Sequence, residues 1–261
     1  MIQIDNVSKS FISRSGGSVL KRAPKQVVHA VQGVTLNAPS GRITGLLGAN
    51  GAGKTTTLRM LGGLFQPDSG SIQVDGILVA RQPREALASM GILGDAHGLY
   101  PRLSARENIV YFGRLQGMGA EAANARAEEL ARLLDMGKIL DRRAEGFSQG
   151  ERMKTALARA LVHDPANIVL DEPTNGLDVL ATRSLRAALR HLRSPEGGSK
   201  CIVFSTHIMQ EVELLCEHVV IVAQGRSVAE GTVDELLDLA GETRFEDAFV
   251  KLAFSPEGAA A

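Results

Sequence analysis

The sequence predicts an α/β fold built around a core of parallel strands. Three short apolar runs, 43–47, 168–170 and 218–223, have the length and composition of strands that are buried on both faces. Leucine-rich stretches with helical spacing lie between them, at 55–64 and 180–193. Strands that alternate with helices in this way are typical of a parallel, doubly wound sheet.

An antiparallel β subdomain is expected at the N-terminus. Residues 2–7 and 27–37 alternate apolar and polar side chains, and 70–79 reads as a further strand. Between the first two strands, residues 12–26 carry four basic residues and no acidic one. This basic insertion is either a solvated hairpin loop or a finger that touches lipid headgroups or a partner.

A helical subdomain is expected within the α/β core, at about 86–163. Residues 104–116 begin with a capping box, in which a serine and a glutamate satisfy the first N–H groups of a helix. Residues 120–135 carry an amphipathic stripe of alanine and leucine. No convincing strand is visible in this stretch, so we predict an all-helical insertion.

Composition excludes several classes of protein. The chain has 261 residues, with 29 basic and 29 acidic side chains, so its formal net charge is zero and no global field favours nucleic acid. Two cysteines cannot form a disulfide scaffold, and we expect a reduced, intracellular setting. No run of 18 apolar residues occurs, and the first residues do not have the pattern of a signal peptide.

Residues 48–55, GANGAGKT, match the pattern G-x-x-x-x-G-K-[ST] between a predicted strand and a predicted helix. Glycines allow successive N–H groups to point at a phosphate, and the helix adds its positive N-terminal end. Lys54 would reach the β- and γ-phosphates, and the Thr55 hydroxyl would bind Mg²⁺. The candidate nucleotide contacts in this loop are Asn50, Gly51, Ala52, Gly53, Lys54, Thr55 and Thr56.

Two acidic residues follow the strand 168–170, at the edge of the sheet where open α/β folds bind ligands. Asp171 has the position of an acid that holds Mg²⁺, directly or through water. Glu172 would polarise the attacking water as a general base. His207 follows another strand, and the same reasoning brings it to the γ-phosphate.

Residues 147–151, FSQGE, precede a predicted helix, and two interpretations are open. Ser148 and Glu151 form a capping box, which is sufficient reason for a serine at a helix start. A serine hydroxyl, the N–H of Gly150 and a helix N-terminus also make an anion site.

These motifs occur in the order found in ATP-binding cassette (ABC) ATPases, which the chain resembles from about residue 2 to 236. The corresponding motifs are Walker A at 48–55, the signature at 147–151, Walker B at 168–172, the D-loop at 175–178 and the switch histidine His207. The resemblance implies a P-loop NTPase core that binds ATP and Mg²⁺. It also implies that 1–236 is one nucleotide-binding domain, followed at 237–261 by a C-terminal helix and a frayed tail.

The resemblance implies partners as well. Two cassettes, expected to be identical, would pair head to tail with each ATP between one Walker A and the other signature. Ser148 and Gly150 would contact the γ-phosphate across that interface, and Asp178 of the D-loop is a further candidate nucleotide contact. Membrane-spanning permease subunits would receive the energy, so the chain is expected at the cytoplasmic face of the cell membrane as a peripheral protein.

Three positions depart from the usual pattern of the family or are ambiguous. The signature is commonly LSGGQ, and Gln149 and Glu151 stand here for glycine and glutamine. Asp95 occupies the position of the Q-loop glutamine and is a candidate Mg²⁺ ligand. Phe11 matches the adenine-stacking aromatic, and His29 competes for that role.

Residues 91–109 and the run FSQGERMK are most similar to bacterial sodium-efflux and multidrug-type ABC exporters. A soluble ABC ATPase of DNA repair or translation is the alternative, although no coiled-coil insertion or second cassette is visible and no nucleic acid partner is expected. A nucleotide-gated regulator with little turnover is a third reading. The intact Lys54, Asp171, Glu172 and His207 argue against it, while Asp95 keeps it open.

Overall fold

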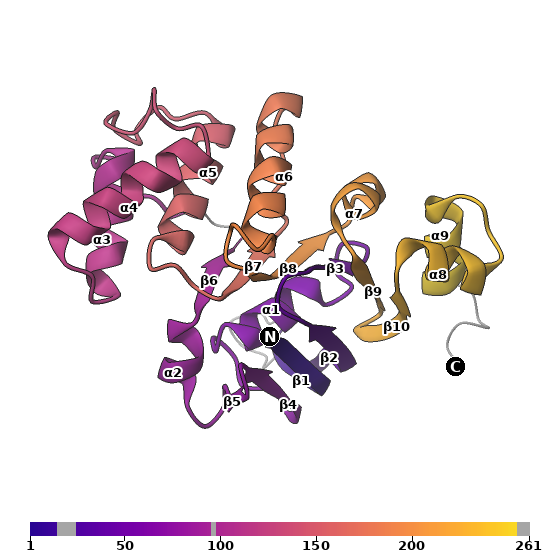
Figure 1. The fold of residues 1–261 in the computed structure, drawn as a ribbon. Coiled ribbons are helices and arrows are strands. Elements are labelled where there is room, and N and C mark those ends of the chain that lie inside the picture. Colours follow the sequence, from indigo (N-terminus) through magenta and orange to yellow (C-terminus); the bar gives the residue numbers. More distant parts are fainter. Residues whose placement is uncertain (15–24, 95–97, 255–261) are drawn as a thin grey trace. The chain divides into compact units, whose positions relative to one another are not determined.

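The computed structural model describes residues 1–14, 25–94 and 98–254 (Figure 1). It confirms the α/β class, and it separates into two compact units that are described in turn. Unit 1 consists of Met1, Ala38–Ile43 and Leu87–Ser205, and unit 2 of Ile2–Asn37, Thr44–Ala86 and Thr206–Ala261.

Unit 2 contains the expected N-terminal antiparallel sheet. Its order is β2 (Lys25–Ala38), β1 (Ile2–Arg14), β4 (Ser69–Val74) and β5 (Ile77–Leu78). The β1 and β4 strands are antiparallel, with Ile4 opposite Ile72, and both side chains are buried.

The prediction of one continuous strand over 70–79 was wrong. Asp75 and Gly76 have φ angles of 50° and 80°, and this left-handed turn folds β5 back onto β4. The Asp-Gly pair is a known turn signal that the apolar and polar alternation concealed.

Unit 2 also contains two parallel strands, and the glycine-rich loop 48–53 follows the first of them. The strand β3 (Ile43–Leu47) pairs in parallel with β9 (His218–Ala223), and β10 (Arg226–Gly231) pairs with β9 in the antiparallel sense. All five residues of β3 are buried, as its unbroken apolar sequence predicted. The helix α1 (Lys54–Leu61) follows the loop after β3.

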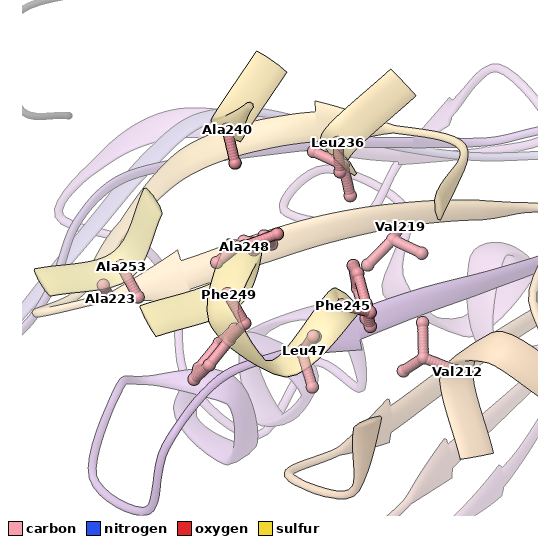
Figure 2. Close-up of a cluster of buried hydrophobic side chains, with 11 residues drawn as sticks. Leu47, Val212, Val219, Ala223, Leu236, Ala240, Phe245, Ala248, Phe249 and Ala253 are labelled. Atoms are coloured by element: carbon pink, nitrogen blue, oxygen red, sulfur yellow. The ribbon is translucent and has the colours of Figure 1, made fainter. Parts of the chain in front are cut away.

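Three C-terminal helices complete unit 2: α7 (Met209–Leu215), α8 (Val233–Ala240) and α9 (Phe245–Phe254). A Thr232–Glu235 capping box starts α8, and Gly241 ends it with a left-handed φ of 65°. Residues on both sides of position 236 belong to one cluster of buried hydrophobic side chains, which Figure 2 shows. The cluster contains Leu47, Val212, Val219, Ile221, Ala223, Leu236, Ala240, Phe245, Ala248, Phe249 and Ala253.

Unit 1 contains a second set of parallel strands. The strand β7 (Asn167–Asp171) lies between β6 (Met90–Leu93) and β8 (Cys201–Thr206) and is parallel to both. We had expected no strand over 86–163, and β6 contradicts that expectation. Its four residues include Gly91, which has little strand propensity, but a Cβ there would lie 2.4 Å from the Ala160 carbonyl oxygen. The glycine thus permits α5 (Gln149–Leu161) to approach the strand closely.

The remaining helices of the predicted insertion lie where the patterns indicated. The α3 helix (Ala105–Leu115) begins with the Ser104–Glu107 capping box, and α4 (Ala120–Leu133) buries the predicted stripe. The helix α6 (Val179–Arg193) follows β7, and the short α2 (Pro83–Ala88) precedes β6. Among the described residues, no helix combines the length and apolar character needed to cross a bilayer.

Candidate nucleotide and metal site

The loop 48–53 of unit 2 connects the buried end of β3 to the first turn of α1. Gly51 and Gly53 have φ angles of 82° and 107°, which non-glycine residues rarely adopt. A Cβ on Gly51 would meet no atom within 4 Å, so the outer side of the loop is open. Backbone with such φ angles can turn successive N–H groups toward a bound anion.

Neighbouring backbone fixes the inner side of this loop. A Cβ on Gly48 would lie 2.4 Å from the Val222 carbonyl oxygen, and one on Gly53 would lie 2.7 Å from that of Ala30. Gly225 donates its amide proton to the Ala52 carbonyl oxygen at 2.9 Å. The β9–β10 turn that carries Gly225 therefore supports the loop from behind, a contribution that the sequence motif did not reveal.

Lys54 turns back onto the loop. Its ammonium Nζ donates to the carbonyl oxygens of Gly48 at 2.7 Å and Ala49 at 3.2 Å, and the residue is 5% exposed. A buried cation is thus kept at the N-terminus of α1, where the helix dipole also favours an anion. Thr55 and Thr56 are half-buried in the first turn of the same helix.

His207 lies in the same unit as this loop. The preceding residue, Thr206, accepts the amide proton of Gly48 at 3.3 Å through its carbonyl oxygen. The Thr206 hydroxyl accepts the Ile208 amide proton at 3.0 Å and shapes the turn that carries the half-buried His207. The hydrogen bond between Gly48 and Thr206 thus holds the backbone next to His207 at the start of the glycine-rich loop.

The acidic pair lies in unit 1, at the end of β7. Asp171 is 6% exposed, and its Oδ1 accepts a hydrogen bond from the Ser205 hydroxyl on β8. Glu172 has a left-handed φ of 49°, and its amide donates to the carbonyl oxygen and the hydroxyl oxygen of Ser205, both at 3.1 Å. Ser205 thus fixes the carboxylate of Asp171 and the backbone of Glu172, and sequence reasoning missed it because β8 is distant in the chain.

Known proteins share this arrangement over most of the chain. The sequence profile of the family described as ABC transporter matches residues 31–175, more than half of the chain. The ABC transporter ATP-binding protein NatA of Bacillus subtilis (strain 168) is 43% identical over 215 residues, which cover 82% of this chain and 86% of that protein. The Nod factor export ATP-binding protein I of Burkholderia lata is 40% identical over 208 residues, which cover 80% of this chain and 67% of that protein.

A solved structure of a dimeric bacterial ABC transporter cassette, MJ0796, is also similar. It has a TM-score of 0.76 and 25% sequence identity, and the match covers 89% of this chain and 98% of that one. The chain belongs to the ABC transporter family. It is an ATP-binding ATPase of that family, with its Walker A loop at 48–55.

The ABC signature starts α5 in unit 1. Ser148 is the N-cap: its hydroxyl accepts the Glu151 amide proton at 3.2 Å, and Glu151 Oε2 accepts the Ser148 amide proton at 2.8 Å. This backbone hydrogen bond from Ser148, together with the Arg142 guanidinium, lowers the pKa of Glu151. Ser148 is exposed and Gly150 half-buried, so the helix N-terminus is accessible within its unit.

The D-loop lies in the same unit and ends at α6. Asp178 is the N-cap of that helix and accepts the Ala181 amide proton at 2.7 Å. This exposed carboxylate therefore has a structural role at the position where we expected a nucleotide neighbour. Gln149, a departure from the common signature, donates its amide proton to the Asn175 carbonyl oxygen of the D-loop at 2.8 Å.

The aromatic candidate for adenine lies on the N-terminal sheet of unit 2. The Phe11 ring packs edge-on against Phe65, with ring centroids 5.3 Å apart, and remains half-buried. His29 is exposed on the neighbouring strand, and its Nδ1 lies 2.9 Å from the Ser10 hydroxyl oxygen. For adenine stacking, Phe11 thus offers a ring that packs against Phe65, and His29 offers an exposed ring.

Three predicted features lie outside the described residues: Asp95, residues 15–24 of the basic insertion and the tail at 255–261. Among the residues that are described, no group of three or more His, Cys, Asp or Glu side chains could hold a metal by itself. A magnesium ion in this family also takes oxygen ligands from phosphates and from a Walker A hydroxyl. Asp171 offers a hard carboxylate oxygen, and the Ser205 hydroxyl holds that carboxylate in place.

Proposed function

We propose that this ABC ATPase is the energy-coupling subunit of a membrane exporter whose transport path is formed by separate permease subunits. The observation that carries the proposal is the supported Walker A cradle with a buried lysine at its helix N-terminus. Export is favoured because a relative that is 40% identical is named for Nod factor export. Sodium or a drug is a candidate cargo through the resemblance noted in residues 91–109.

ATP would be held by the backbone N–H groups of 50–56 and by Lys54. Gly51 leaves room at the outer side of the loop, and a charged ammonium group is available beside it. Lys54 Nζ binds the carbonyl oxygens of Gly48 and Ala49 in its own loop. Its ammonium group would exchange those partners for phosphate oxygens. Phe11 or His29 would stack on the adenine.

Mg²⁺ would be held by the Thr55 hydroxyl and the Asp171 carboxylate, with Asp95 as a further expected oxygen ligand. The bound cation neutralises negative charge on the transferred phosphoryl group. Asp171 is suited to this role because Ser205 occupies Oδ1 and orients the carboxylate. The hydroxyl of Thr55 is presented by the first turn of α1.

Glu172 would act as the general base for the attacking water, and His207 would contact the γ-phosphate. The Glu172 backbone is held by Ser205 in a left-handed conformation, which aims its side chain away from the regular path of β7. His207 is held by the Thr206 turn. These two residues, with Lys54, constitute the proposed catalytic set.

Two copies of the cassette would close on two ATP molecules. Ser148 and Gly150 would present the N-terminus of α5 to the γ-phosphate bound by the other copy, and Asp178 would lie near this interface. A solved relative described as dimeric supports this assembly. ATP that binds only the closed form would drive closure, and its hydrolysis would release it.

Permease subunits at the cytoplasmic face of the cell membrane would receive this motion. A soluble ABC ATPase of DNA repair or translation is the second candidate, and zero net charge gives it no electrostatic support for nucleic acid. No nucleic acid partner is therefore proposed.

Capture from native membranes tests the proposal. The chain is pulled down from membranes solubilised in mild detergent, and the Glu172→Gln variant is used with MgATP to hold the closed dimer. We expect a stoichiometric hydrophobic polypeptide to co-purify and to change the ATPase rate of the wild-type chain. Recovery from the soluble fraction alone, without such a partner, would contradict the transporter function.

A further inference from the structure

The side chain of Gln149 joins the signature helix to the D-loop. Gln149 is the first residue of α5, and its Nε2 donates to the Asn175 carbonyl oxygen at 2.8 Å. Gly176, with a φ of 69°, lies against the same side-chain amide, because a Cβ built there would overlap Gln149. The D-loop backbone and this side chain therefore fit each other directly.

Hydrogen bonds continue from this contact to the acidic pair. Asn175 donates its amide proton to the Glu172 carbonyl oxygen at 3.1 Å. The Glu172 amide donates to Ser205, and the Ser205 hydroxyl donates to Asp171. An unbroken series of hydrogen bonds within unit 1 thus runs from Gln149 to Asp171.

The helix itself does not need Gln149. Ser148 and Glu151 already form both hydrogen bonds of the capping box, so the N-terminal cap of α5 does not use the Gln149 side chain. Glu172, in contrast, holds a left-handed backbone conformation that non-glycine residues keep only where surrounding contacts impose it. The contact of Gln149 therefore serves the loop rather than the helix.

We propose that Gln149 is a positioning residue that holds residues 172–178 in register with the signature helix and so fixes the backbone of Glu172. The inference rests on the proposed role of Glu172 as general base. Loss of the side-chain donor would leave ATP binding intact and slow the hydrolytic step. The loop would also open more often, since one of its anchoring hydrogen bonds would be absent.

The Gln149→Met variant of the full chain tests this role, because methionine has a similar length but no N–H donor. We expect kcat for MgATP to fall about 3- to 10-fold, as for the loss of one hydrogen bond, with KM unchanged within about twofold. Hydrogen exchange of backbone amides in 172–178 should become faster. Gln116→Met is the matched control, since Gln116 is exposed at the end of α3 and its side chain has no hydrogen-bond partner among the described residues.

A second variant, Gln149→Glu, separates positioning from helix stability. A carboxylate at the first helical position favours the helix dipole, so thermal stability should be kept or raised. The donor is nevertheless lost, so kcat at saturating MgATP should fall as in Gln149→Met. A kcat equal to wild type in both variants, with unchanged exchange in 172–178, would overturn the positioning role.

The proposed function and the positioning role of Gln149 can be refuted by different results. A wild-type chain without MgATP turnover would count against the proposed function. In that case exchange in 172–178 still decides the structural part, because faster exchange in Gln149→Met supports the link and unchanged exchange refutes it. Wild-type turnover with an unchanged kcat in Gln149→Met would remove only the role of Gln149.

Discussion

Ser205 on β8 donates its hydroxyl proton to Oδ1 of Asp171 on β7. The same hydroxyl oxygen accepts the amide proton of Glu172 at 3.1 Å. One fully buried side chain thus orients a carboxylate and fixes the residue that follows it.

The Ser205→Ala variant is expected to lower kcat for MgATP and to raise the Mg²⁺ concentration needed for half-maximal rate. The hydrogen bond to a charged group is worth about 1.5–3 kcal/mol, and its loss frees the Asp171 carboxylate to turn. Steady-state ATPase assays over a Mg²⁺ titration measure both effects. An unchanged Mg²⁺ dependence would show that Asp171 needs no orientation from β8.

The Lys54→Ala variant is expected to bind ATP about 10- to 100-fold more weakly, because the charged partner of the phosphates is removed. Calorimetric titration with nucleotide measures the affinity. The Gly48 and Ala49 carbonyl oxygens also lose their donor, so the variant should be titrated below a separately measured melting temperature. Wild-type affinity in a folded variant would contradict the assignment of this loop.

Stability should fall as the pH drops below about 6.5, the usual pKa of histidine, partly because of His163. Burial lowers the pKa of His163, and the nearby Lys200 charge acts in the same direction. The Met90 carbonyl oxygen, 3.1 Å from Nε2, and Asp164 oppose this shift without reversing it. The unfolded chain therefore takes up the proton first as pH falls, and this favours unfolding. The penalty grows until the pH reaches the lowered, folded-state value.

Thermal melts at pH 7.5 and 5.5 measure this dependence in the wild type and in His163→Gln. The variant should lose less stability between the two pH values than the wild type does. His29→Gln is the control for the removal of a histidine, because His29 is exposed. Equal pH dependence of His163→Gln and the wild type would remove His163 as the cause.

The Phe249→Ala variant should destabilise the chain by about 3–5 kcal/mol, as for a large aromatic side chain removed from a core. Phe249 is 4% exposed in the cluster of Figure 2, whereas Phe254 at the end of α9 is 56% exposed. The Phe254 ring packs edge-on against Phe249, with ring centroids 6.0 Å apart, so Phe254→Ala removes this ring contact and should cost only about 0.5–1.5 kcal/mol. Denaturant unfolding of both variants compares them, and equal stabilities would mean that α9 contributes little to the core.

Local patterns allowed much of the fold to be predicted. The apolar strands β3, β7 and β9 and the capping boxes of α3 and α5 were predictable because each depends on neighbouring residues alone. The Walker A loop was predictable for the same reason, since its eight residues are contiguous. The capping box and the signature motif at Ser148 coincide, so a structural reading and a functional one started from the same residues.

Features that depend on distant segments were not predictable from one sequence. The strand β6 is short and contains a glycine whose purpose is visible only beside Ala160. Ser205 and the contact between Gln149 and Asn175 require strands and loops that are far apart in the chain to meet. A single residue at such a position belongs to no periodic pattern and to no motif of fixed spacing, so the sequence does not reveal its contact.

The cluster that includes Leu47 has a consequence for protein synthesis. Leu47 leaves the ribosome early, whereas Phe245 and Phe249, which share its cluster, are among the last residues of the described chain to emerge. The apolar face of β3 therefore remains uncovered until α9 has been synthesised. A nascent chain that stalls before α9 would present this surface to chaperones and to other nascent chains, so synthesis of α9 favours folding over aggregation.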